Sequence, residues 1–387
     1  MTRPLTALAG PALVLALALP PAAARDDPDP EYGGKKASAW VDVLVNDTSA
    51  RKRALAVDAL AKLWADKRYK ESVASIGRAL RLDSSAAVRA QAAIALGTLK
   101  ETDIKNGLGV KDLVDALGTE KESRVRREIA VVMTRFPPVA KLGVVPLTAA
   151  LKDPDPATRV AVAEALAQTG SEGKSAAVNL APLLNDQDKA VRVAAVVALG
   201  RTSPEGASAI AETMAMMLGT EKDADIRAEL VTSLGLLGEK SPVVVNALAA
   251  LLADPEEDLR RRAARTLGTF GTAAGPAADA LYKTAATDKA KDIRVDAAHA
   301  FGSALGPDLK GRVREFLALL KDPEYEVRLA VVEEVGALGN DLKGDAETLK
   351  VLRTRLSDPH VKVREAVAAA IKKIEKKPEP KEPKKEP

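Results

Sequence analysis

The sequence predicts an all-α solenoid of about ten stacked two-helix units, and three observations support this fold class. The same phrase returns along the chain, as DSSAAVRAQAAIALG at residue 83, DQDKAVRVAAVVALG at 186 and DPEYEVRLAVVEEVG at 322. Its arginine recurs every 33 to 37 residues, and a fixed period of this size is typical of stacked repeats. Aromatic residues make up only 3% of the chain, which favours closely packed Ala-, Leu- and Val-rich helices over one large core.

Residues 1–24 are typical of a secretory signal peptide. One basic residue, Arg3, precedes an apolar run over 5–19, and three alanines end at Ala24 before an acidic segment. The apolar run is shorter than the ~20 residues that a membrane span needs, so we expect cleavage after Ala24 and not an uncleaved anchor. We therefore expect a periplasmic or extracellular protein without an integral membrane span. The chain has no cysteine, so neither disulfides nor thiolate metal sites are available to it.

The segments that flank the array are rich in Pro and charge. Residues 25–36, RDDPDPEYGGKK, are expected to be a flexible linker, and residues 377–387 a disordered Lys/Glu/Pro tail. Residues 372–387 hold seven lysines and four glutamates, whereas 25–371 hold fifty basic and fifty acidic residues. A neutral array weakens any nucleic-acid function, because such proteins carry a basic stripe on the binding face.

Each unit within 37–376 is predicted to contain two helices. Counted from the arginine, positions −1, +3, +4 and +7 are mostly apolar, which is the spacing of one buried helical face. Position +6 is usually small and position +8 is often Gly, which suggests either close helix contact or an early helix end. Gly at +11 in four units, at 170, 238, 271 and 339, fits a C-terminal cap.

The first helix of a unit often ends in a leucine pair before an acidic residue, as in EFLALLKD over 315–322. The Asp-Pro pairs at 153, 254, 322 and 358 predict a turn in which Asp caps the second helix. The third unit departs from the pattern, with Val132 and Met133 in place of small residues and a stop at Pro137. We expect a local irregularity in curvature there.

The recurring phrase D-x-x-x-x-[VIL]-R-x-x-A-x-x-A-L-G resembles the HEAT repeat, in particular the bacterial HEAT-like repeats related to phycocyanobilin lyases. The resemblance covers about residues 37–376 and implies a right-handed α-α superhelical solenoid of about ten HEAT repeats whose second helices line the concave face. It also implies a hydrogen-bonded ladder between acids and arginines of neighbouring units. All ten units carry a carboxylate six residues before the arginine. The ladder residues, given as the acid and the arginine of each unit in turn, are Asp47 and Arg53, Asp83 and Arg89, Glu120 and Arg126, Asp153 and Arg159, Asp186 and Arg192, Glu221 and Arg227, Asp254 and Arg260, Asp288 and Arg294, Asp322 and Arg328, and Asp358 and Arg364.

No catalytic or metal-binding constellation accompanies this ladder. An active site needs its residues once, whereas the acid and the arginine recur in every unit, so we interpret them as structural. The two histidines, His299 and His360, have no second histidine at metal-ligand spacing, and both are expected on the surface. The chain has no P-loop and no G-x-S-x-G motif. We expect no cofactor, no metal and no enzymatic activity.

The expected function is that of a non-catalytic scaffold that presents a concave helical surface to protein partners or peptide segments. The candidate binding surface comprises the variable positions Arg261, Arg262, Arg265, Asp296, His299 and Glu333. Two alternatives stay open, a lyase-like module that handles a chromophore or other ligand, and cell-envelope attachment through the lysine-rich tail. We expect a monomer.

Glu334 is the residue that the repeat does not explain. It lies at +6, where no other unit has a charge. It indicates either a locally open layer near the end of the array or a specific contact, and we favour the open layer.

Overall fold

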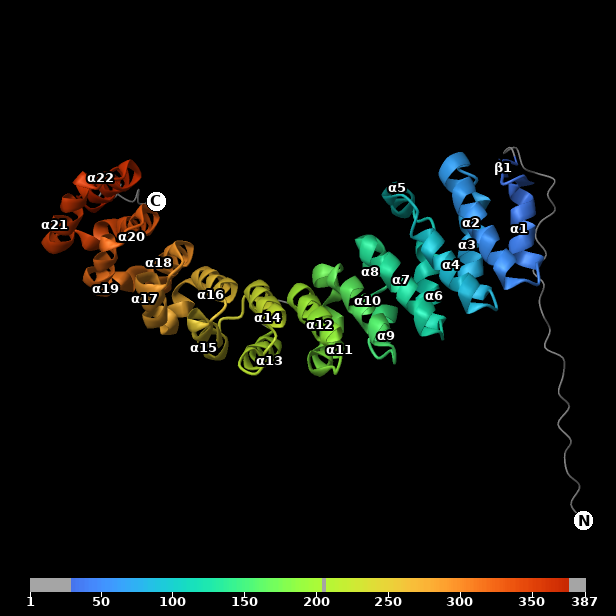
Figure 1. The fold of residues 1–387 in the computed structure, drawn as a ribbon, viewed down its shortest axis with the longest axis horizontal. Coiled ribbons are helices and arrows are strands. Elements are labelled where there is room, and N and C mark those ends of the chain that lie inside the picture. The colour runs from blue at the N-terminus through green and yellow to red at the C-terminus, as the bar shows by residue number, and fades with distance from the viewer. Residues whose placement is uncertain (1–28, 204–206, 376–387) are drawn as a thin grey trace, which may run out of the picture.

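The computed structural model describes residues 29–203 and 207–375, and within them an array of paired helices curves into an arc (Figure 1). Each pair is called a layer, numbered one to ten along the chain. The second helices are α2 (Ala50–Lys67), α4 (Ala86–Leu96), α7 (Ser123–Arg135), α10 (Pro156–Ala167), α12 (Lys189–Thr202), α14 (Ala224–Leu237), α16 (Glu257–Phe270), α18 (Lys291–Leu305), α20 (Tyr325–Leu338) and α22 (Val361–Glu375). This confirms the all-α solenoid.

The first helices are more irregular, since several are interrupted by 3₁₀ turns. They are α1 (Ala37–Asn46), α3 (Glu71–Leu82), α6 (Val110–Thr119), α8 (Pro137–Leu142) with α9 (Val144–Ala150), η1 (Gly170–Ala176) with α11 (Ala177–Leu180) and η2 (Ala181–Asn185), α13 (Ser208–Leu218), α15 (Pro242–Ala250) with η3 (Leu251–Ala253), η4 (Gly271–Ala277) with α17 (Ala278–Thr287), η5 (Gly306–Asp308) with α19 (Leu309–Phe316) and η6 (Leu317–Lys321), and η7 (Gly339–Leu342) with α21 (Ala346–Thr354) and η8 (Arg355–Ser357). A short extra helix, α5 (Glu101–Lys105), precedes α6.

The two kinds of helix occupy opposite sides of the arc. In Figure 1 the second helices α10 to α20 lie along the inner, concave side, and the first helices α9 to α21 lie along the outer, convex side. Consecutive second helices pack directly against one another. Their core positions are buried as the spacing predicts; in α12, for example, Val191, Ala195, Val196 and Leu199 are buried.

The amino-terminal edge of the array corrects the expected linker. Within residues 25–36, strands β1 (Glu31–Tyr32) and β2 (Lys35–Lys36) form an antiparallel hairpin. Gly33 and Gly34 supply its two-residue turn with positive φ angles of 61° and 76°, the conformation that such tight hairpins require. Trp40 of α1 donates from Nε1 to the carbonyl of Tyr32 at 2.8 Å, which ties the hairpin to the first layer.

The helix ends partly follow the sequence. The four glycines at +11 all have positive φ, between 46° and 63°, and three of them, Gly238, Gly271 and Gly339, are the C-terminal caps of their helices. The cap of α10 is instead Gln168, two residues before Gly170. The acid at −6 does not cap the second helix, however. Its side chain closes a turn by accepting from the backbone two residues later, as Asp153 does from Asp155 at 3.0 Å. The cap is that later residue, and Asp155 accepts from the backbone N–H of Thr158.

The expected signal peptide, residues 1–24, and the tail, residues 377–387, lie outside the described residues. Within the described part, no helix is both long enough and apolar enough to cross a membrane.

Candidate functional site

A ladder of arginines and carboxylates runs through the array and links each layer to the next. In the rung between the ninth and tenth layers, Arg328 donates from Nε and Nη2 to the two carboxylate oxygens of Asp358 at 2.9 and 2.8 Å. Its Nη1 donates to the carbonyls of Asp322 and Pro323, both at 2.9 Å. One planar guanidinium therefore binds the acid of the next layer and the turn of its own layer.

The same geometry recurs with partners 27 to 31 residues apart. The interlayer pairs are Arg53 with Asp83, Arg89 with Glu120, Arg126 with Asp153, Arg159 with Asp186, Arg192 with Glu221, Arg227 with Asp254, Arg260 with Asp288, Arg294 with Asp322, and Arg328 with Asp358. Each of these nine arginines thus pairs with the acid of the following unit, and all of them except Arg227 also donate to a backbone carbonyl in the turn of their own unit.

Four places depart from the regular rung. Arg227 bonds Asp254 through Nη1 alone, and its buried Nε has no hydrogen-bond partner among the described residues. Arg192 approaches Glu221 only to 3.9 Å, although it keeps its bond to the carbonyl of Asp186. At the ends of the ladder, Asp47 is paired with Lys52 of its own layer at 3.2 Å. Arg364 donates to the carbonyls of Asp358 and Pro359, and no carboxylate within the described residues pairs with it.

Five rungs of the ladder lower the pKa of their carboxyl group, those of Glu120, Asp153, Asp186, Asp288 and Asp358. Burial would raise the pKa of Asp153, but bonds from Arg126 and from the backbone of Asp155 outweigh it and lower that pKa below its ordinary value. For Asp358, the bond from Arg328 is the main cause of a lowered pKa, acting against burial. Carboxylates with such lowered pKa values have a structural role and are poor proton donors or acceptors near neutral pH.

A second interlayer contact explains the glycines at +8. The +6 residue of each following layer packs on them, so that a β-carbon on Gly200 would lie 2.9 Å from Cα of Ser233, and one on Gly97 would lie 2.7 Å from a methyl of Val132. The recurring glycine is therefore a point of close approach between second helices, and at Gly97 it is also the residue that ends α4.

The candidate binding surface lies on the concave side, and part of it pairs across layers. Arg261 and Arg265 of α16 both donate from Nε to Asp296 of α18, at 3.2 and 2.8 Å. Arg262 instead donates to Asp258 on its own helix at 2.6 Å and to Thr232 of α14 at 3.0 Å. The structure brings these residues of the sixth to eighth layers into one continuous polar surface.

His299 and Glu333 continue this surface into α20, and they explain Glu334. His299 Nδ1 lies 2.8 Å from Oε1 of Glu334, and Nε2 lies 3.9 Å from Oε2 of Glu333. The Glu334 side chain is only 22% exposed, and a β-carbon on Gly302 would lie 2.3 Å from its Oε2. The favoured open layer is therefore wrong, and Glu334 makes a specific contact in the space that Gly302 leaves.

The second histidine differs from the surface residue that the sequence predicts. The ring of His360 is partly buried and stacks on Tyr325, with ring centroids 3.4 Å apart and planes 10° from parallel. His299 is 40% exposed at its side chain. Among the described residues, no group of three or more His, Asp or Glu side chains is arranged to hold a metal ion.

Comparison with known proteins identifies the repeat. The sequence profile of HEAT repeats matches residues 37–134, 144–235, 212–302 and 313–383. The chain belongs to the HEAT-repeat family. No curated protein matches it over its sequence.

Solved structures share the fold of these HEAT repeats at low sequence identity. An engineered protein is 22% identical with a TM-score of 0.60, and the match covers 88% of this chain and 99% of the other. Karyopherin Kap121p, bound to the extreme C-terminus of the protein phosphatase Cdc14p, is 14% identical with a TM-score of 0.50, covering 87% of this chain and 41% of Kap121p. Kap95p in a structure with RanGDP is 17% identical with a TM-score of 0.48, covering 87% of this chain and 51% of Kap95p.

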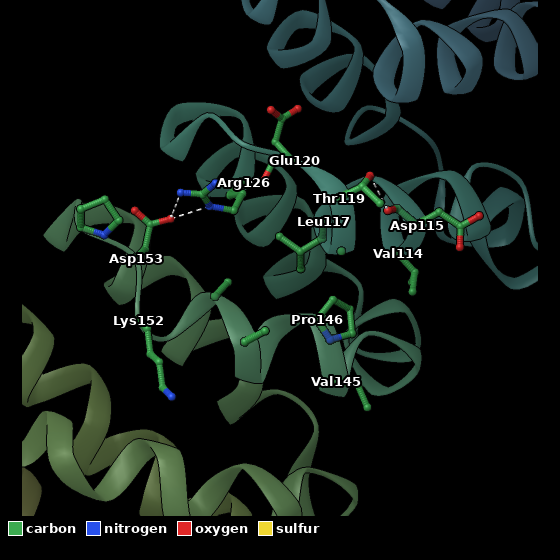
Figure 2. Close-up of a pocket in the computed structure, with 14 residues that line it drawn as sticks. Val114, Asp115, Leu117, Thr119, Glu120, Arg126, Val145, Pro146, Lys152 and Asp153 are labelled. Carbon is green, nitrogen blue, oxygen red and sulfur yellow. Dashed lines mark hydrogen bonds and ion pairs between the residues drawn. The ribbon is translucent and has the colours of Figure 1, made fainter. Parts of the chain in front are cut away.

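The HEAT array also carries a groove on its convex side, between α6 and α9. It has a volume of about 650 Å³, and Figure 2 shows Val114 and Leu117 across from Val145 and Pro146. Its charged lining includes the ladder pair Arg126 and Asp153. Beside this groove, Gly143 divides the first helix of the fourth layer into α8 and α9.

Exposed apolar side chains on the second helices were not part of the predicted surface. Leu55, Ile94 and Val131 are exposed on α2, α4 and α7, at the +2 and +5 positions that the candidate surface uses farther along the chain. The same alignment identifies them, but an aliphatic residue in an aliphatic-rich repeat gives no separate signal.

Proposed function

We propose that this HEAT-repeat solenoid is a non-catalytic scaffold that holds a protein partner or peptide segment on its concave face, outside the cytoplasm. The observation that carries the proposal is the double fastening of neighbouring second helices, by a ladder rung and by the close contact at +8. A surface held in this way is formed before the partner arrives, so little conformational entropy remains to be lost on binding.

The side chains on this face support selectivity. Positions +2 and +5 vary between layers, from Leu55 and Ile94 near the amino terminus to Arg262 and Glu333 farther along. A structural relative, Kap121p, is bound to a segment of another protein, which accords with a solenoid serving as a binding surface. The balanced charge of the array favours a protein partner over nucleic acid.

Site-specific photo-crosslinking in the native cell tests the binding face. A photoreactive residue at Ile94 or Arg265 is expected to capture a defined partner, whereas one at Val178, which is 81% exposed in the first-helix row, serves as the convex control. Alanine at Arg262 or Glu333 is expected to weaken capture at Arg265. Capture from Val178 alone, unchanged by those alanines, would overturn the concave assignment.

The proposed location depends on the amino-terminal segment. Signal-peptide cleavage after Ala24 predicts a mature chain that begins at Arg25. Intact-mass measurement of the protein from the periplasmic or extracellular fraction checks this directly. A chain that keeps Met1 and stays in the cytoplasm would refute export while leaving the scaffold proposal standing.

Two sequence features support alternatives. The resemblance to phycocyanobilin-lyase-related repeats favours ligand or chromophore handling, and a coloured protein purified from its native cell would support it. The lysines of residues 372–387 favour attachment to anionic envelope polymers. Removal of 372–387 would then release the protein from the envelope, whereas the scaffold proposal predicts unchanged partner capture.

A further inference from the structure

We propose that His299 and Glu334 form a proton-operated latch between α18 and α20, which holds the eighth and ninth layers together when His299 is protonated and loosens them when it is neutral. If the concave face binds a partner, as proposed above, the latch regulates that same site, because His299 and Glu333 belong to it. The latch itself depends only on contacts within this chain.

The contact occupies a place that the repeat keeps for small side chains. At the other boundaries where a glycine lies at +8, the residue packed on it is Val132, Ser233, Thr266, Ala300 or Ala370. Here a carboxylate lies against Gly302, and its Oε1 meets His299 Nδ1 at 2.8 Å. The two helices therefore approach one another across an ionisable pair and not across an apolar or hydroxyl contact.

The carboxylates around the His299 ring favour its protonated, positively charged form. On its own helix lies Asp296, which accepts from Arg261 and Arg265 of α16. From α20, the glutamates at 333 and 334 face the ring at 3.9 and 2.8 Å. Within the described residues, neither an arginine of α16 nor a charged side chain of α22 forms an ion pair with these two glutamates.

Protonation changes what the pair can do. An imidazolium donates from both ring nitrogens, so it can face both glutamates, whereas a neutral ring has one N–H and no charge. The neutral state leaves the mostly buried Glu334 carboxylate without a compensating cation, and such a group favours hydration. The Glu334 side chain is already 22% exposed, and a local separation of α18 and α20 would hydrate it further.

The direction of the pH effect follows from the same contact. The hydrogen bond that His299 donates to Glu334 raises the pKa of His299 above its ordinary value, against the opposing effect of burial, and Glu333 and Asp296 add to the increase. A raised pKa in the folded state means that the stabilisation is fully present below the unfolded value of about 6.5 and is lost as pH rises through the folded value. The contact between His299 and Glu334 thus holds α18 and α20 together at low pH and weakens at high pH.

Proton NMR of the full chain tests the pair, since the protein has only two histidines. His360→Asn assigns the remaining ring signals to His299. The expected result is a His299 pKa above 6.5 that falls clearly in Glu334→Gln and falls less in Glu333→Gln, the matched neighbour with the longer contact. A His299 pKa at or below 6.5, or no change in Glu334→Gln, would overturn the proposal.

Hydrogen exchange, corrected for the intrinsic effect of pH, tests the loosening. Amides of α18 and α20 should lose protection between about pH 5.5 and about pH 8.5, by tenfold for each unit that the His299 pKa exceeds its unfolded value. His299→Lys should keep high protection at both pH values, and His299→Gln should show low protection at both. Persistent pH dependence in His299→Gln would exclude the latch and assign the effect to His360, which stacks at the start of α20.

These measurements need no partner, so their failure is separate from failure of the scaffold proposal. If the latch is present and crosslinking at Arg265 is the same at both pH values, the latch exists but does not regulate binding, and the regulatory part of the proposal is refuted.

Discussion

Removing the guanidinium of Arg328 should be among the most damaging single changes to the ladder. The residue is 7% exposed and its partner Asp358 is 3% exposed, and four hydrogen bonds end on this one side chain. Arg328→Ala leaves a buried carboxylate without its cation, and breaking a buried ion pair in this way costs about 3–5 kcal/mol.

Arg192 provides a matched control in the same structural position. It lies 3.9 Å from Glu221, so its alanine variant mainly leaves the carbonyls of Asp186 and Gln187 without a donor. Loss of such hydrogen bonds costs about 1–3 kcal/mol. We therefore expect Arg328→Ala to destabilise its layers by roughly 2 kcal/mol more than Arg192→Ala does, from the difference between these two costs.

The assay must resolve layers, because a solenoid is stabilised by contacts between neighbours and opens locally. Hydrogen exchange should show that α20 and α22 lose about two to three orders of magnitude of protection in Arg328→Ala, since each 1.4 kcal/mol is tenfold. Layers one to three should be unchanged.

A second variant separates charge from packing. Asp358→Asn keeps an acceptor for the backbone N–H of His360, which now bonds the carboxylate at 3.0 Å. Combined with Arg328→Met, it removes both charges and should recover part of the lost protection. Equal losses in Arg328→Ala and Arg192→Ala, or no recovery in the double variant, would refute the assignment of the ladder as the main interlayer fastening.

Three further outcomes follow from neighbouring features. Gly200→Ala should destabilise the protein by about 1–3 kcal/mol through overpacking. Gly235 is at the same repeat position, but its nearest neighbour lies 3.5 Å from a new β-carbon, so Gly235→Ala should stabilise the protein by up to about 1 kcal/mol through helix propensity. Urea unfolding compares the two variants. Asp155→Ala should cost about 1 kcal/mol by removing a side-chain cap, visible as faster exchange in the first turn of α10. The pKa values of Asp153 and Asp358 are lowered on folding. The stabilisation by these carboxylates is therefore present above the unfolded carboxyl value of about 3.9 and is lost as pH falls through the folded value. An acid titration followed by circular dichroism should show unfolding below about pH 4 and none from this cause at neutral pH.

The array itself could be predicted from the sequence because every layer has the same hydrogen-bonding requirement at its turn. Each turn between helices leaves carbonyls that need donors, and each unit supplies an arginine at the same offset. The periodicity also separates the ladder arginine from its neighbours, as at Arg260 within Arg260-Arg261-Arg262. Periodicity alone does not show that the arginine of one unit pairs with the acid of the next. That pairing depends on how far each layer rotates on its neighbour.

The Glu334 contact shows where such reasoning stops. The residue was recognised as an exception, but its explanation lies 32 residues earlier, at Gly302, and on the facing ring of His299. The other boundaries supply a usable rule after the fact, since wherever +8 is Gly, the +6 residue of the next layer packs on it. A charged +6 residue opposite a glycine therefore indicates a side chain accommodated between layers, and not a layer that is open.

The hairpin over residues 31–36 was missed for a different reason. Composition rich in Pro, Gly and charge suggested a linker, whereas Gly33-Gly34 between two short polar strands is itself a turn signal. The hairpin became informative only with Trp40, whose indole N–H needs an acceptor and finds the carbonyl of Tyr32. Composition describes an average over a segment, whereas one side-chain donor can decide where that segment lies.

These exceptions share a physical cause that bears on function. In a repeat array the recurring residues satisfy the requirements of stacking, so selection for a partner can act only where a residue is free to vary or where a neighbour makes room for an unusual one. Gly302 makes such room, and Glu334 and His299 occupy it with groups that stacking does not require. The boundary between α18 and α20 is consequently the place where a change in solution conditions can alter the concave surface without breaking a rung of the ladder.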